Sequence, residues 1–214
     1  QANIKSAQAQ VAQASDVLGS TSDMLARARE LTLSAASGTM SPTDRATIAA
    51  ELNAIADEID GLAATRDSNG EPLFAAGNAR VVRFDSDVSF APVQSAASAF
   101  VVGGNALSTS LRDAATAMAA GNQAGIDTAL TNITGAISHI ADQTAALGLS
   151  AGRLERIGDS LSSRGIEIAD ERQSVEEVDL QTAIAQLNAQ DLTLNAAQAA
   201  FAKINRQTLF DLLN

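Results

Sequence analysis

The sequence predicts a mainly α-helical protein with a long antiparallel helical hairpin, a long C-terminal helix and a small β-containing insertion. Three observations support this fold class. Apolar residues recur every seven positions over most of the chain, turn-forming residues separate the repeating stretches, and one middle segment lacks the repeat. Hydrophobic residues make up 46% of the 214 residues but aromatic residues only 3%, so small and aliphatic side chains dominate. Such residues suit narrow seams between helices.

Residues 2–36 predict one long helix. Two sets of seam residues repeat every seven positions, namely Ile4, Val11, Leu18 and Leu25, and Ala7, Ala14, Thr21 and Ala28. The small residues of the second set allow a partner helix to approach closely. Gln1 already stands in this rhythm, so we expect that the chain begins inside a helix whose N-terminal part is missing.

A second helix is predicted after a short connection. Ser41 has the residue type of an N-cap, Pro42 suits the first helical position, and Asp44 favours the positive end of a helix. Apolar residues follow at steps of four and three, at Ile48, Leu52, Ile55, Ile59 and Leu62. Because a short connection makes consecutive helices antiparallel neighbours, the two segments predict a hairpin. DSNGEP, residues 67–72, predicts the turn that ends it.

The pattern changes between Leu73 and Gly104. RVVRFDSDVSF and SAFVV are short runs typical of β-strands, and polar residues, Pro92 and the Gly103–Gly104 pair separate them. Four of the six phenylalanines also lie here, at positions 74, 84, 90 and 100. We predict a hairpin or a small sheet, followed by a short helix over residues 107–120.

The longest repeat lies in the second half of the chain. Its seam residues are Ile133, Ile140, Leu147, Leu154, Leu161 and Ile168, with Leu130, Ile137, Thr144, Ala151, Gly158 and Gly165 as the companion positions. This pattern predicts a helix over residues 126–170. An acidic stretch follows, in which Ser174 and Glu177 have the spacing of a capping box, so a new helix is predicted there.

The final helix carries an apolar stripe that the other predicted elements are too small to cover. Its residues are Leu180, Ile184, Leu187, Leu194, Phe201, Ile204, Leu209, Leu212 and Leu213. Because chain ends are usually polar, we predict that this stripe is an assembly interface. The expected organisation is a discontinuous helical core of residues 1–72 and 123–172, an insertion of residues 73–122, and an assembly helix of residues 173–214.

Composition argues against several other classes of function. A formal net charge of −11 repels nucleic acid and anionic membranes, and the lack of cysteine excludes disulfides and thiolate metal sites. His139 is the single histidine and has no nucleophile or base at a recognisable spacing. The carboxylates of residues 167–179 lack the spacing of a calcium loop. We therefore predict no catalytic residue, no cofactor and no metal.

Several stretches resemble a known family. ARARELTLSAASGTMSPTDRATIAAEL, residues 26–52, resembles the N-terminal core of the flagellin superfamily, and residues 174–214 resemble its closing segment. LGLSAGRLERI, residues 147–157, is similar to part of its long C-terminal core helix. SNGEPLFAAG, residues 68–77, is similar to a turn of the hook-associated branch, although Pro72 and Leu73 depart from that branch's pattern.

The resemblance implies a structural subunit of the bacterial flagellum and no enzyme. It further implies export of an unfolded chain, an extracellular location and coiled-coil packing between neighbouring copies in a ring. The implied partners are the hook protein, a second junction protein, flagellin, and an export chaperone on the C-terminal helix. The role favoured is joining the hook to the filament.

Two alternatives remain open from the sequence. One is the flagellin of the filament itself, which shares the same helical core. The other is a module in which the insertion binds a glycan or a receptor, and which would expose Phe84 or Phe90.

Overall fold

The computed structural model describes residues 2–36 and 40–211, with side chains described for 2–36, 40–177 and 180–204. Its contacts divide the chain into two units, residues 1–159 and residues 160–214. The first unit contains α1 (Ala2–Ala35), α2 (Pro42–Ala63), α4 (Leu107–Ala119), the small insertion elements and the beginning of α5 (Gln123–Asp211). The described part of the second unit is the remainder of α5.

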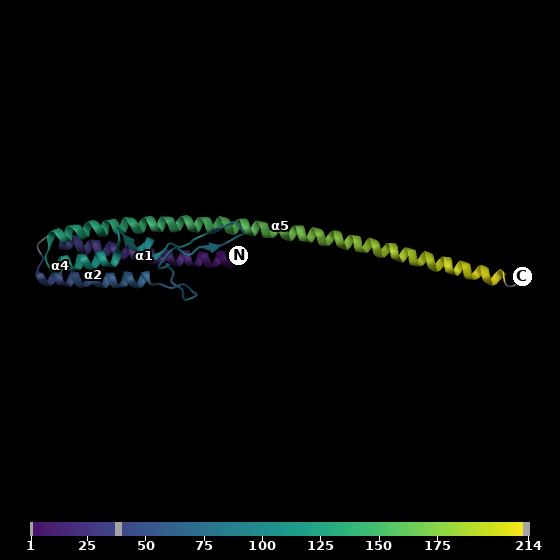
Figure 1. The fold of residues 1–214 in the computed structure, drawn as a ribbon, viewed down its shortest axis with the longest axis horizontal. Coiled ribbons are helices and arrows are strands. Elements are labelled where there is room, and N and C mark those ends of the chain that lie inside the picture. Colours follow the sequence, from purple (N-terminus) through teal and green to yellow (C-terminus); the bar gives the residue numbers. More distant parts are fainter. Residues whose placement is uncertain (1, 37–39, 212–214) are drawn as a thin grey trace. The chain divides into compact units, whose positions relative to one another are not determined.

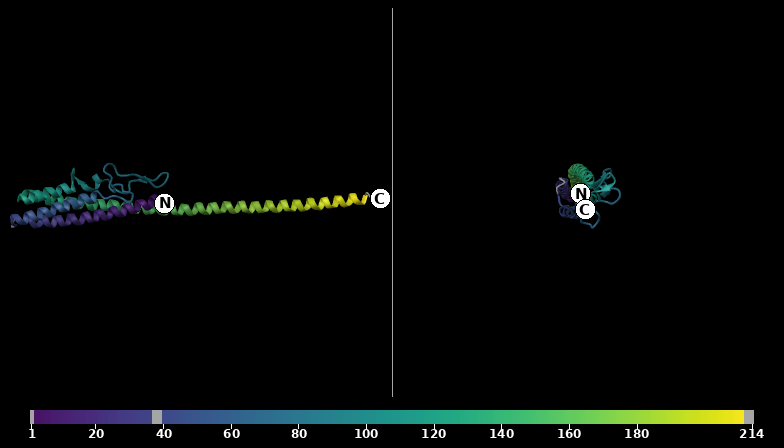
Figure 2. Two further views of the ribbon diagram at one scale, coloured as in Figure 1. Left: turned by 90° about the horizontal axis from the view of Figure 1, so that it is seen from below. Right: turned by 90° about the vertical axis from the view of Figure 1, so that its left-hand side faces the viewer.

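α1 and α2 form the predicted hairpin. Figures 1 and 2 show them side by side with α4 and the first part of α5. The predicted cap is confirmed, because the Ser41 side chain accepts a hydrogen bond from the Asp44 backbone N–H at 3.1 Å and Pro42 opens the helix. The Arg27 guanidinium donates to the Glu51 carboxylate at 2.9 Å and links the two helices.

The predicted seam of α1 is confirmed. All eight of its residues, Ile4, Ala7, Val11, Ala14, Leu18, Thr21, Leu25 and Ala28, are buried. The two buried threonines of α1 are satisfied, because Thr21 donates to the Val17 carbonyl oxygen at 2.8 Å and Thr32 to that of Ala28 at 2.7 Å. A polar side chain therefore occupies a seam position without an unsatisfied hydroxyl.

The first part of α5 packs antiparallel to α1. At one end the Gln123 side chain lies 3.5 Å from the Ala36 carbonyl oxygen, and at the other a Cβ atom on Gly158 would lie 3.7 Å from Ile4 Cγ2. The seam residues Ile133, Ile140, Leu147 and Leu154 are buried as predicted.

The companion positions predicted on α5 are wrong by one residue. Ala129 and Ala136 are buried, whereas Leu130 and Ile137 are only half-buried, and Thr144 and Ala151 are exposed. A seven-residue repeat permits a companion three or four positions from the main seam. The neighbouring helices decide which of the two faces inward.

The helix start predicted at Ser174 is also wrong, because α5 continues through it. Side chains one turn apart form hydrogen bonds with one another along this acidic stretch. The Arg172 guanidinium donates to Glu176 at 2.9 Å, and the Gln173 amide donates to Glu177 at 3.2 Å. Such pairs stabilise a helix at its surface, so the acidic residues do not interrupt it.

The insertion contains two small antiparallel sheets, as predicted. β1 (Val82–Arg83) pairs with β2 (Ser89–Phe90), and β3 (Val101–Val102) pairs with β4 (Asn105–Ala106). Gly103 and Gly104 join β3 to β4 with φ values of 61° and 87°, a conformation that favours glycine.

One predicted strand is partly a helix. Within SAFVV only the two valines belong to a strand, because α3 (Ala96–Phe100) precedes them. The Ser95 hydroxyl accepts a hydrogen bond from the Ser98 backbone N–H at 3.2 Å, so it caps an alanine-rich turn that favours helix.

Three of the described contacts hold the insertion against α5. The Gln94 amide donates to the Gln143 carbonyl oxygen at 3.0 Å, and His139 Nε2 donates to the Ser98 carbonyl oxygen at 2.8 Å. The Arg153 guanidinium carbon lies 4.2 Å from the centroid of the Phe90 ring, a cation–π geometry. These contacts use one face of α5 and leave another face of the helix without a neighbour from the insertion.

Asp67 anchors the turn predicted at residues 67–72. Its buried carboxylate accepts hydrogen bonds from the backbone N–H groups of Asn69 and Glu71 at 2.9 and 3.1 Å, and from the Gln10 amide of α1 at 2.8 Å. Burial alone would raise the pKa of Asp67, but these donors and the nearby Arg80 guanidinium lower it below its ordinary value. The carboxylate therefore stays ionised and fixes the turn to α1.

Candidate functional site: two exposed apolar surfaces

The first candidate surface is the predicted stripe on α5. Six of its residues are described, and between 51% and 68% of each is exposed: Leu180, Ile184, Leu187, Leu194, Phe201 and Ile204. The side chain of Leu209 is not among those described, and Leu212 and Leu213 lie outside the described residues. Large apolar side chains in such a row are the usual mark of a surface that binds another protein.

The segment that carries this stripe is almost free of charge. Asp191 is the only charged residue between Leu180 and Ala202, in a chain of which 18% is charged. A helix that stays in water normally carries charged residues on its exposed face. The composition of residues 180–202, which we call the neutral segment, therefore favours burial on more than one side.

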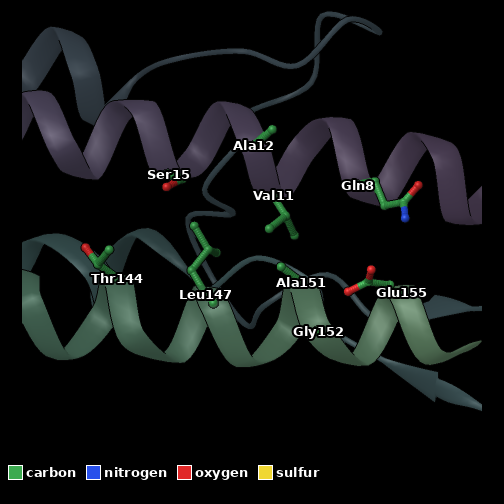
Figure 3. A pocket seen from close by; sticks show the side chains of 10 residues that line it. Gln8, Val11, Ala12, Ser15, Thr144, Leu147, Ala151, Gly152 and Glu155 are labelled. Atoms are coloured by element: carbon green, nitrogen blue, oxygen red, sulfur yellow. The ribbon is translucent and has the colours of Figure 1, made fainter.

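The second candidate surface is an open groove of about 580 Å³ between α1 and the first part of α5 (Figure 3). Val11 and Leu147 point toward each other at its floor and are 5% and 1% exposed. Gln8, Ala12 and Ser15 line it on α1, and Thr144, Gly148, Ala151, Gly152 and Glu155 line it on α5. Glu155 is thus the single charged residue of its lining.

The groove has the spacing of a helix-binding surface. Its residues on α1 are four and three positions apart, at 8, 12 and 15, and those on α5 repeat the same steps at 144, 148, 151 and 155. Residues at these steps form one line along a helix, so two parallel lines of mostly small side chains flank the Val11–Leu147 floor. A third helix would lie along them in coiled-coil fashion.

The sequence pattern indicated the stripe but not the groove. Thr144 and Ala151 were expected to be buried seam residues, and the structure places them in the groove instead. Gln8, Ala12, Ser15, Gly148 and Gly152 were not predicted to have a role. The signal that marks them is a second line of small residues next to each large-residue seam.

The structure also bears on metal binding, membrane spanning and the predicted aromatic platform. Among the side chains that the structure describes, no group of three or more His, Asp or Glu residues is placed to hold a metal ion. None of the helices in the described part of the chain has an apolar run of the length that a bilayer requires. Phe84 is buried and packs against the half-buried Phe90 with centroids 4.9 Å apart, so neither ring forms the exposed platform of the glycan-binding alternative.

The fold defines the class of protein as a flagellin-like helical subunit with a small β-containing insertion. Family models identify the family. The bacterial flagellin N-terminal helical region matches residues 1–79, and the bacterial flagellin C-terminal helical region matches residues 130–213. The chain belongs to the bacterial flagellin family and is a structural component of the flagellum.

Solved structures share this fold. A protein described as a flagellar hook-associated protein of Vibrio parahaemolyticus has a TM-score of 0.73 and 20% identity, over 79% of this chain and 87% of its own. FlgL of Xanthomonas campestris has a TM-score of 0.69 and 14% identity, over 80% of this chain and 96% of its own. Flagellin of Bacillus cereus has a TM-score of 0.58 and 23% identity, over 73% and 86%. No curated protein matches the sequence.

Proposed function

We propose that this chain is a subunit of the junction between hook and filament. FlgL is the hook-associated protein 3 of that junction. Hook-associated structures match this chain with TM-scores of 0.73, 0.69, 0.62 and 0.56, and flagellin matches it with 0.58. The turn SNGEPLFAAG favours the same branch. The role is mechanical, without catalysis or a cofactor.

The exposed stripe of α5 is the observation that carries this proposal. Apolar surface gains about 25 cal/mol per Å² when it leaves water, so a row of half-exposed Leu, Ile and Phe side chains drives association. In the proposed organisation, residues 173–214 form the assembly helix, and residues 1–72 and 123–172 form the core. Copies pack through this helix in a ring that contacts the hook protein, a second junction protein and flagellin.

The same stripe supports a chaperone-bound state before assembly. A secreted subunit with this surface would aggregate inside the cell unless a partner covered it. We propose that an export chaperone binds the C-terminal helix and that the unfolded chain then leaves the cell through the flagellar export channel, to act outside it.

Immunogold labelling of intact flagella tests the location. We expect a narrow band of label where the hook meets the filament. Label along the entire shaft would refute the junction role and favour flagellin.

Truncation tests the assembly helix. We expect a chain ending at Asp179 to fold and remain in solution but to form no junction, because it lacks the whole stripe. Circular dichroism of the purified chain measures its folding, and electron microscopy of cells that carry only this chain measures assembly. Filaments restored by the truncated chain would contradict the proposal.

Filament flagellin is the second candidate function, since the B. cereus flagellin shares the fold at 23% identity. The two functions differ in polymerisation. Purified flagellin forms long filaments by itself, whereas a junction subunit is expected to stop at a short ring. Electron microscopy of the purified full chain distinguishes them.

A further inference from the structure

The turn that follows α2 contains the single Asn–Gly pair of the sequence, Asn69–Gly70. Gly70 has a φ value of 80°, a conformation that favours glycine, so the turn itself requires this residue. We propose that the pair is a site of spontaneous deamidation, which the folded turn suppresses and which proceeds whenever the turn is not formed. The proposed assembly function gives the pair no role, so this inference goes beyond it.

The reaction requires only the Asn–Gly pair and water. The Gly70 backbone nitrogen gives its proton to solvent and attacks Cγ of the Asn69 side chain. The side-chain amide group takes up a proton and leaves as ammonia, so that a succinimide ring forms. Water then opens the ring at either carbonyl and leaves aspartate or isoaspartate. Glycine favours the attack because it has no Cβ atom to hinder the approach, and both residues are exposed to water.

The folded turn engages the nitrogen that would attack. The Gly70 N–H donates to the Asp67 carbonyl oxygen at 2.9 Å. On the other side of the same residue, the Arg66 guanidinium donates to the Gly70 carbonyl oxygen at 2.7 Å. Attack on Asn69 requires the Gly70 nitrogen to lose its proton, and loss of the proton breaks the hydrogen bond to Asp67. The folded turn therefore disfavours the nucleophilic form of this nitrogen.

Asp67 also fixes the backbone that ring closure would have to rotate. Its carboxylate oxygen Oδ1 accepts hydrogen bonds from the N–H groups of Asn69 and Glu71, at 2.9 and 3.1 Å, one on each side of the Asn–Gly pair. Its own N–H donates to the Glu71 carbonyl oxygen at 2.8 Å. Because the succinimide ring fixes the backbone between Asn69 and Gly70, its closure would move Glu71 relative to Asn69. The hydrogen bonds of Asp67 resist this movement.

Contact with α1 makes the turn part of the folded first unit. The Gln10 amide donates to Asp67 Oδ2 at 2.8 Å, and the Gln13 amide donates to the Arg66 carbonyl oxygen at 3.0 Å. Both glutamines are distant from the turn in the sequence, so they hold it only while α1 and α2 are packed together. An unfolded chain lacks these contacts, and its Asn–Gly pair is then free to react.

The isoaspartate product would weaken the turn. Isoaspartate at position 69 routes the backbone through the side-chain carbon and adds a backbone atom before Gly70. The N–H groups of residues 69 and 71, which share Asp67 Oδ1, would then be farther apart along the chain. Deamidation of an unfolded chain therefore leaves a permanent change where the turn contacts α1.

Mass spectrometry of the natural full chain tests the inference. Trypsin releases residues 67–80, which contain Asn69 and also Asn78, an exposed asparagine followed by Ala79. One sample is kept folded and another is kept in guanidinium chloride, in the same mildly alkaline buffer, and a sample digested without incubation gives the background. We expect Asn69 to deamidate at least about tenfold more slowly in the folded sample, because attack requires local opening of the turn. Asn78 should react slowly in both samples, since the Ala79 side chain hinders the attack.

Two variants of the folded chain locate the protection. Asp67→Ala removes the carboxylate that holds Asn69 and Glu71, so it should raise the deamidation rate of Asn69 by roughly threefold to tenfold. Asp142→Ala, at an exposed position on α5, is the matched control and should leave the rate unchanged. Circular dichroism measures whether each variant is folded.

Three results would overturn the inference. The first is an equal deamidation rate of Asn69 in the folded and the unfolded natural chain, and the second is an unfolded chain in which Asn69 reacts no faster than Asn78. The third is a folded Asp67→Ala chain that reacts no faster than Asp142→Ala. If Asp67→Ala does not fold, the comparison within the natural chain decides alone. None of these rates depends on where immunogold places the chain in the flagellum.

Discussion

Leu18 of α1 and Leu187 of α5 occupy equivalent places in two seven-residue repeats, yet they meet different surroundings. Leu18 is 0% exposed and lies in the seam of the first unit, whereas Leu187 is 60% exposed. The first unit covers its own repeat with α1, α2, α4 and the beginning of α5. Within the described part of residues 160–214 there is one helix, so its repeat has no second element of that unit to pack against.

This difference shows that a repeat of apolar residues does not reveal where its partner is. The repeat indicates that a helix has one apolar face that must be covered. Whether the covering helix comes from the same chain or from another depends on the elements that lie beside it. Two alike patterns therefore stabilise the fold in one region and leave an apolar face exposed in the other.

The largest difference between the two regions is expected when each leucine is replaced by alanine. Leu18→Ala should lower the free energy of unfolding by about 2–5 kcal/mol, because it leaves a cavity in a packed seam. Leu187→Ala should change it by no more than about 0.5 kcal/mol, since an exposed side chain loses few contacts. Urea denaturation monitored by circular dichroism measures both free energies of unfolding. Equal losses of free energy in the two variants would contradict the difference between the two regions.

A smaller effect is expected at Asp67, which holds a turn of the first unit to α1. Asp67→Asn should lower the free energy of unfolding by about 1–3 kcal/mol at pH 7, because buried N–H donors lose a charged acceptor. Asp142→Asn, at an exposed position on α5, is the matched control and should have no effect.

The Asp67 effect should also depend on pH. Its pKa is lowered in the folded chain, so its contribution is complete above the unfolded value of about 3.9 and is lost as the pH falls through the folded value. The difference between the natural chain and Asp67→Asn should therefore shrink in strong acid. Unfolding curves at pH 7 and below pH 3 measure it, and a constant difference would show that the carboxylate's charge is not the cause.

The smallest effect is expected for the exposed ion pairs between α2 and α4. The Arg112 guanidinium donates to both Asp57 and Asp60 at 2.7 Å, and these carboxylates raise the pKa of Arg112. Arg112→Ala should lower the thermal midpoint of unfolding less than Leu18→Ala or Asp67→Asn does, since water screens exposed pairs. At about 1 M salt, where the screening length is about 3 Å, the difference from the natural chain should vanish. A loss that persists there would point to packing by the arginine stem.

Much of the first unit was predictable because its signals are local. The Ser41–Pro42 cap, the turn at residues 67–72 and the seam of α1 each follow from side chains within a few positions of one another. The misplaced elements were those in which competing local signals balance. Ser174 and Glu177 have capping-box spacing, but the side-chain pairs of Arg172 and Gln173 support a continuous helix there.

The candidate surfaces were predictable to different degrees. The stripe from Leu180 to Ile204 was visible as a row of large residues, although its role as an interface stays a prediction. The groove was not predictable, since Ala12 and Gly148 are ordinary small residues in the sequence. They become a surface only when α1 and α5 lie side by side with Val11 and Leu147 between them.

Local sequence alone dictates that this chain forms long helices with one apolar face each, because the spacing of side chains along a helix is a property of neighbouring residues. It also determined the helical hairpin, the turn positions and an acidic, cysteine-free surface. The packing of the helices determines which repeats are covered and which remain open, and on which side of the main seam the companion residues lie. Coverage depends on residues distant in the sequence, and a seven-residue repeat fits an internal partner as well as an external one.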